Sequence, residues 1–119
     1  MESPRNPAYI VGCRLTFIGS SHSRIQIAEK DLHTHLKARM ARRGVTREEI
    51  EQTLNEGWEA VDAHPGTQGK VSVLAYQRQW EGQFYEEKEV AVYYKVVRGS
   101  LVLLTVKARY GKNFPRGQR

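Results

Sequence analysis

Lys88–Tyr110, the stretch KEVAVYYKVVRGSLVLLTVKARY, decides the fold of this 119-residue chain. It contains two runs rich in Val, Leu and Tyr, Lys88–Val97 and Leu101–Tyr110, and these residue types are typical of β-strands. Arg98-Gly99-Ser100 lies between the two runs. We expect a tight hairpin at this point, because a short glycine-containing loop joins two antiparallel strands directly.

The register of this hairpin follows from a two-residue loop between Val97 and Ser100. These two residues then form a pair, and Val90 pairs with Lys107. Side chains alternate between the two faces of a strand. One face of the second strand is expected to carry Leu101, Leu103, Thr105, Lys107 and Arg109, and the other Val102, Leu104, Val106, Ala108 and Tyr110. The first face changes from apolar residues to cations, which predicts a rim where the sheet emerges from beneath the helices. Solvated charges at an ordinary strand end have the same pattern.

Two short helices are expected before the strands. The first has Asp31 as its expected N-cap. Leu32, Leu36 and Met40 recur every four residues and form an apolar stripe along it. Gly44 ends this helix, because glycine readily adopts the left-handed conformation that follows a last helical turn.

The second helix has an unusually complete start signal. Thr46 is followed three residues later by Glu49, which is the pattern of a capping box. Val45 and Ile50 flank this box and are placed to form a hydrophobic staple. We therefore expect a helix hairpin whose second helix ends at Gly57.

Further strands are expected at Trp58–Asp62 and from Val71 to Tyr76, with a turn at Glu81-Gly82 before the long hairpin. The element order is two helices followed by four strands. We predict an α+β fold in which the two-helix hairpin packs on one face of a four-stranded antiparallel sheet.

The compact domain is expected to span residues 24–114, with a short strand at Arg24–Ala28. Residues 1–23 are interpreted as an N-terminal extension that contains one short strand within Tyr9–Ile18. Residues 115–119 are expected to form a polar, flexible tail.

The charge of the chain favours a polyanionic partner. The net charge is +6 and the sequence pI is about 9.7. From Lys95 to Arg119 there are seven Lys or Arg residues and no Asp or Glu. Positive charge attracts phosphate-bearing partners, although many basic proteins bind none.

Several function classes are excluded by composition and spacing. Cys13 is the only cysteine, which excludes an intramolecular disulfide and a cysteine-rich metal site and favours the cytoplasm. No His/Cys/Asp cluster has ligand spacing, so we expect no metal. No glycine-rich phosphate loop is present, so we expect no nucleotide cofactor. No run approaches about 18 apolar residues, so we expect no membrane span.

The first helix carries a candidate site. At 100° per residue, His35, Arg39 and Arg42 form one ridge beside the apolar stripe. Arg43 falls inside the stripe, so its guanidinium must either reach solvent or meet a partner. A solvated basic helix whose last turn complements the helix dipole has the same pattern, and periodicity alone favours that interpretation.

These motifs resemble a known family. The pattern His35-x-x-x-Arg39-Met40-x-x-Arg43-Gly44-Val45 is followed by a short acidic helix and a hairpin ending Val102-Leu103-Leu104-Thr105-Val106. Together they resemble a bacterial family of unknown function that is grouped with the RelE-like and BrnT-like toxins in the barnase–EndoU–colicin–RelE superfamily. The resemblance covers residues 25–114.

The resemblance implies a RelE-like fold, RNA as substrate, an antitoxin as protein partner, and metal-independent cleavage by side chains. Carried over residue by residue, the first-helix histidine is His35, the helix-terminal arginine is Arg43 and the strand threonine is Thr105. Three residues that follow Thr105 on the same strand are of types that RelE-like sites use near the end of the sheet: Lys107, Arg109 and Tyr110. The predicted catalytic residues are His35, Lys107 and Arg109, and the predicted substrate-binding residues are Arg39, Arg42, Arg43, Thr105 and Tyr110.

Three hypotheses follow. In the first, the chain is a small toxin-like endoribonuclease in which His35 transfers the proton while Lys107 and Arg109 stabilise the charge on phosphorus. In the second, the same basic residues bind nucleic acid or a protein without catalysis. In the third, apolar residues 8–18 pair with another chain as an added strand.

Overall fold

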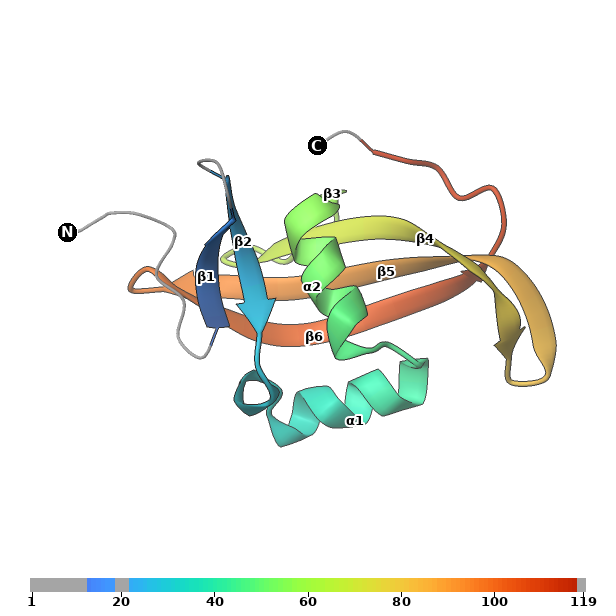
Figure 1. The fold of residues 1–119 in the computed structure, drawn as a ribbon, viewed down its shortest axis with the longest axis horizontal. Coiled ribbons are helices and arrows are strands. Elements are labelled where there is room, and N and C mark those ends of the chain that lie inside the picture. The colour runs from blue at the N-terminus through green and yellow to red at the C-terminus, as the bar shows by residue number, and fades with distance from the viewer. Residues whose placement is uncertain (1–12, 19–21, 118–119) are drawn as a thin grey trace.

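The computed structural model describes residues 13–18 and 22–117 (Figure 1). Its elements are β1 (Cys13–Ile18), β2 (His22–Ile27), the 3₁₀ helix η1 (Glu29–Asp31), α1 (Thr34–Arg43), α2 (Arg47–Glu56), β3 (Trp58–Glu59), β4 (Gln68–Trp80), β5 (Gln83–Val97) and β6 (Ser100–Gly111). The last four strands form an antiparallel sheet in the order β3-β4-β5-β6, and β1 pairs with β2 in a separate hairpin. The predicted α+β fold is confirmed.

The N-terminal hairpin is attached to α2. Part of the strand expected within Tyr9–Ile18 is present as β1, and residues 9–12 lie outside the described residues. β2 starts at His22, two residues before the expected start of its strand. The Asn55 amide on α2 accepts from the backbone N–H of Ile25 at 2.8 Å and donates to its carbonyl at 2.9 Å. These bonds satisfy backbone groups of β2 that would otherwise require a third strand.

The N-cap of α1 lies two residues later than the sequence predicted. Asp31 ends η1, and one of its carboxylate oxygens accepts the backbone N–H of Ala28 at 2.7 Å. The N-cap is His33, whose Nδ1 accepts the backbone N–H of Leu36 at 3.2 Å. The assignment of Asp31 was therefore wrong, because its carboxylate is engaged by the preceding turn. Gly44 ends the helix in the left-handed conformation, as expected.

α2 begins as the sequence predicted. The Thr46 hydroxyl accepts the Glu49 N–H at 3.1 Å, and the Glu49 carboxylate accepts the Thr46 N–H at 3.0 Å. This reciprocal pair is the predicted capping box. α2 crosses one face of the sheet, whereas α1 lies along the β6 edge (Figure 1).

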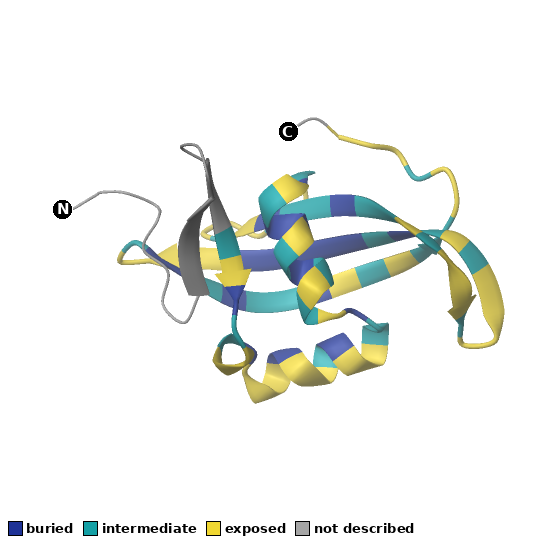
Figure 2. Ribbon diagram, viewed as in Figure 1, coloured by how far each residue is buried: buried dark blue, intermediate teal, exposed yellow. Residues whose placement is uncertain are grey.

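A single hydrophobic core fills the space between the helices and this face of the sheet (Figure 2). The helices contribute Leu36, Met40, Ile50 and Leu54, and the sheet contributes Val90, Val92, Leu103 and Val106. The opposite face of the sheet, here called the open face, carries no helix in the part of the chain that the structure describes.

The β5–β6 register differs from the predicted one beyond the pair of Tyr94 and Leu103. Val97 pairs with Ser100, as expected, but Val90 pairs with Ala108 instead of Lys107. Tyr93 pairs with Thr105 and Tyr94 with Leu103, so Leu104 is a bulged residue without a partner. The expected face of β6 is therefore wrong beyond Leu103, because one extra residue reverses every later side chain. Leu101, Leu103, Val106, Ala108 and Tyr110 share the helix side, and Thr105, Lys107 and Arg109 share the open face.

Candidate functional site

The structure does not bring together the three predicted catalytic residues. His35 is exposed on α1. Lys107 and Arg109 pair with Ala91 and Glu89, which alternate along β5 with valines buried under the helices, so both cations lie on the open face. In the described part of the chain, no hydrogen bond, ion pair or ring contact joins His35 to either cation.

The predicted ridge on α1 is present at the surface. His35 and Arg42 are exposed and Arg39 is half-buried. Within residues 13–18 and 22–117, none of the three side chains has a carboxylate partner, and α1 itself contains no acidic residue. Among the described residues, the ring of His35 contacts only that of His33, at 6.4 Å between ring centroids. In this part of the chain, the ridge therefore presents two arginines without a counter-charge.

Arg43 and Tyr110 hold α1 against the edge strand. The Arg43 guanidinium donates to the Val106 carbonyl at 2.8 Å, so it has found a partner instead of reaching solvent. The Tyr110 hydroxyl donates to the Arg43 carbonyl. Both residues, which the sequence predicted to bind substrate, therefore already have structural partners.

His33 holds the other end of α1, and the sequence analysis gave it no such role. Its Nδ1 accepts the Leu36 N–H, so Nε2 is the nitrogen that donates to the Leu103 carbonyl, at 3.1 Å. β6 is an edge strand, and such a strand leaves backbone groups unpaired unless another element covers them. His33 and Arg43 therefore cap two β6 carbonyls, on either side of the bulge at Leu104.

Thr105, predicted to bind substrate, lies beside this bulge as the cross-strand partner of Tyr93. Its hydroxyl oxygen is buried and accepts or donates no hydrogen bond within the described residues.

A buried lysine is the largest feature that the sequence analysis missed. Lys88 is 1% exposed, and its ammonium donates to Glu49 at 2.7 Å and to the Gly44 carbonyl. The ring centroids of Tyr76 and Tyr110 lie 5.3 and 5.4 Å from Nζ. Strand alternation contained the signal, because Lys88 lies on the same face of β5 as the buried residues at 90 and 92. Glu49 therefore both completes the capping box and neutralises a core cation.

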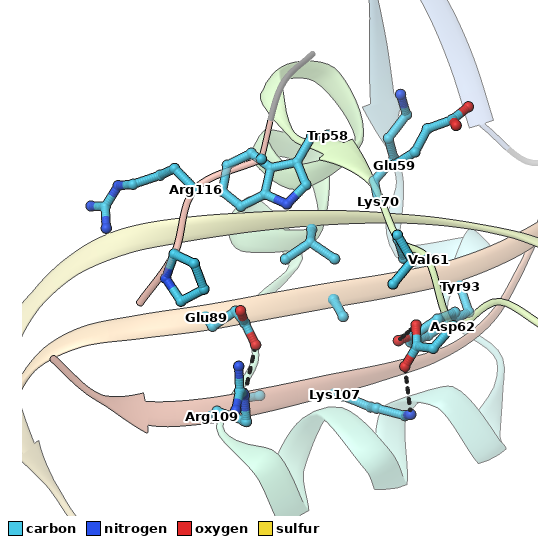
Figure 3. Close-up of a pocket in the computed structure, with 16 residues that line it drawn as sticks. Trp58, Glu59, Val61, Asp62, Lys70, Glu89, Tyr93, Lys107, Arg109 and Arg116 are labelled. Atoms are coloured by element: carbon cyan, nitrogen blue, oxygen red, sulfur yellow. Dashed lines mark hydrogen bonds and ion pairs between the residues drawn. The ribbon is translucent and has the colours of Figure 1, made fainter. Parts of the chain in front are cut away.

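A groove of about 840 Å³ occupies the open face between the loop at 60–62 and the tail at 115–117 (Figure 3). Its lining includes Val71 and Ala91 of the sheet. The cations of β6 point toward carboxylates in this groove: Lys107 lies 3.6 Å from Asp62 and Arg109 lies 2.7 Å from Glu89.

These ion pairs change the interpretation of the acid-free C-terminal sequence. Besides the two pairs in the groove, Arg116 of the tail lies 3.0 Å from Glu87 of β5. Residues earlier in the sequence therefore supply counter-charges to three of the seven cations of this segment. The groove and its tail wall are close to charge balance, whereas the α1 ridge is not.

The same contacts shift several pKa values. The Tyr93 hydroxyl, which donates to Asp62 at 2.8 Å, lowers the pKa of Asp62. Burial opposes this shift, and the charge of Lys107 then adds to the lowering. Arg116 and the backbone N–H of Phe114 lower the pKa of Glu87. Burial, and then the Asp62 carboxylate, raises the pKa of Tyr93 to about 12.

Among residues 13–18 and 22–117, no three His, Cys, Asp or Glu side chains are grouped so that they would hold a metal ion. In the same residues, no helix has the length and apolar character needed to cross a membrane. Comparisons with protein-family models, curated proteins and solved structures found no match. The fold and the site define an α+β protein with two arginines on α1 that have no carboxylate partner among the described residues, and a charge-paired groove on the open face of the sheet.

Proposed function

We propose that this chain is a cytoplasmic RNA-binding protein that contacts the phosphate backbone through the ridge on α1. The observation that supports the proposal is the contrast between Arg39 and Arg42, which have no carboxylate partner among the described residues, and the cations of β6, which have one each. Unpaired cations gain more from a polyanion, because no existing ion pair has to be broken.

RNA is the polyanion that the resemblance to RelE-like and BrnT-like toxins suggests, and an acidic antitoxin is the protein partner that it implies. A partner of this kind would compete for the same ridge, because carboxylates and phosphates both bind arginine forks.

Binding without cleavage is the form of the proposal that the geometry supports best. Phosphoryl transfer to a 2′-hydroxyl needs a proton carrier and cationic groups at one phosphate. His35 lies on the ridge, whereas Lys107 and Arg109 lie on the open face, engaged with Asp62 and Glu89.

Two variants with equal charge loss test the proposal. Arg39→Gln/Arg42→Gln removes two charges from the ridge, and Lys107→Gln/Arg109→Gln removes two from the groove. Affinity for a labelled single-stranded RNA is measured by fluorescence anisotropy at several salt concentrations. We expect the ridge variant to reduce the slope of log K against log salt by about 1.4, and the groove variant to leave it unchanged. Equal losses in both variants would show that only net charge matters.

Catalysis is tested in the same preparation. The labelled RNA is incubated with the protein in EDTA and its length is followed with time. Intact RNA supports binding alone. Cleavage that disappears in a folded His35→Gln variant would instead support the endoribonuclease hypothesis.

A further inference from the structure

Arg109 is held in one orientation at the groove by Nε, while the two terminal nitrogens of its guanidinium have no partner among the described residues. Nε donates to Glu89 at 2.7 Å, and the guanidinium carbon lies 5.0 Å from the centroid of the Phe114 ring. The two terminal nitrogens have no partner in the part of the chain that the structure describes, and the side chain is 64% exposed. A guanidinium fixed through Nε presents these terminal groups as a fork for the two oxygens of one oxyanion.

Lys107 lies beside this fork. It is two residues earlier on the same face of β6, about 7 Å along the strand. Its ammonium is 5.0 Å from the centroid of the Tyr93 ring and 3.6 Å from Asp62, which is longer than a direct charge-assisted hydrogen bond. Its N–H donors are therefore available to a ligand held by Arg109.

Apolar side chains continue the groove away from the two cations. Val61 is fully exposed although it lines the groove, and Trp58 and Pro115 line it as well. Asp62 and Glu89 disfavour a chain of several phosphates here, because each further negative charge would lie near a carboxylate. A ligand with a single oxyanion on an apolar body fits both the apolar lining and the limit that the two carboxylates place on negative charge.

We propose that this groove binds a small organic oxyanion, a carboxylate or a phosphate monoester, with the charged group at Arg109 and Lys107 and an apolar or aromatic body against Val61 and Trp58. The site is separate from the α1 ridge and does not depend on RNA binding.

Titration calorimetry with phenyl phosphate, benzoate and benzylamine tests this site on the full chain. The first two share a ring and differ in the oxyanion, so their relative affinities distinguish a phosphate from a carboxylate ligand. Benzylamine carries the opposite charge on a similar body. We expect at least one of the two anions to bind saturably with a Kd of about 1 mM or lower, and benzylamine to bind more weakly.

Arg109→Lys keeps the charge but removes the fork, and we expect it to weaken anion binding about tenfold. Arg98→Lys, in the exposed β5–β6 loop, is the matched control and should bind as wild type does. Lys107→Gln provides a second variant if Arg109→Lys lowers the melting temperature. The proposal is overturned if neither anion saturates, if benzylamine binds more tightly, or if neither groove variant weakens binding. Arg39→Gln/Arg42→Gln should bind each anion as wild type does, so failure here is distinguishable from failure of the RNA proposal.

Discussion

His33 and His35 lie two residues apart at the start of α1, but within the described residues only His33 bonds to other parts of the fold. It caps the helix through Leu36 and reaches β6 through the Leu103 carbonyl. His35 is exposed, and in the same part of the chain its ring contacts only that of His33. Adjacent histidines therefore have separable roles, which substitution can measure.

His33→Ala should reduce the free energy of unfolding by about 1–2 kcal/mol, because it removes an N-cap and exposes a β6 carbonyl. His35→Ala, the matched control, should change it by less than about 0.5 kcal/mol. Urea denaturation of both variants gives the comparison. Equal effects would show that the His33 bonds do not hold α1 in place.

The buried ion pair of Lys88 and Glu49 allows a second test by substitution of single residues. Glu49→Ala leaves a buried ammonium without its counter-charge and should cost about 3–5 kcal/mol of folding free energy. Combining it with Lys88→Met removes the unpaired charge, so the double variant should regain much of that loss. A double-mutant cycle by chemical denaturation measures the coupling, and strictly additive losses would contradict a direct pair.

At the scale of elements, α2 was the most predictable part of the fold, because its start signal is local. Thr46 and Glu49 are three residues apart, and both hydrogen bonds of the capping box are formed between them. Thr46→Ala should therefore cost about 1 kcal/mol, read from the melting curve, without moving any residue of the ridge or groove. An unchanged melting temperature would show that the cap is dispensable.

The faces of β6 were not predictable, because the bulge at Leu104 depends on contacts across the sheet and along α1. His33 and Arg43 bond to carbonyls on either side of it, 70 and 63 residues away in sequence. Local pattern therefore predicts that the strand exists, whereas distant partners decide which side Lys107 faces. The predicted site failed to assemble for this reason, although its ridge on α1, which depends only on helical spacing, is present.

At the scale of the whole molecule, the C-terminal tail closes one side of the groove. Glu87 accepts the Phe114 N–H and the Arg116 guanidinium, both at 3.0 Å. Gly117 then lies against the indole of Trp58, where any larger side chain would collide. One carboxylate thus positions a segment that crosses from the end of β6 to β3.

Acid should release this tail. The pKa of Glu87 is lowered in the folded state from its ordinary value of 4.5, so its contribution is fully present above that pH and is lost as pH falls through the lower folded value. Trp58 fluorescence, in a Trp80→Phe background, should report exposure of the indole as the pH is lowered below the ordinary carboxyl pKa of 4.5. Glu87→Gln should show the released signal already at neutral pH, whereas Glu86→Gln, its exposed neighbour, should behave as the background protein does. If the Trp58 signal of Glu87→Gln at neutral pH matched that of the background protein, the tail would be held without Glu87.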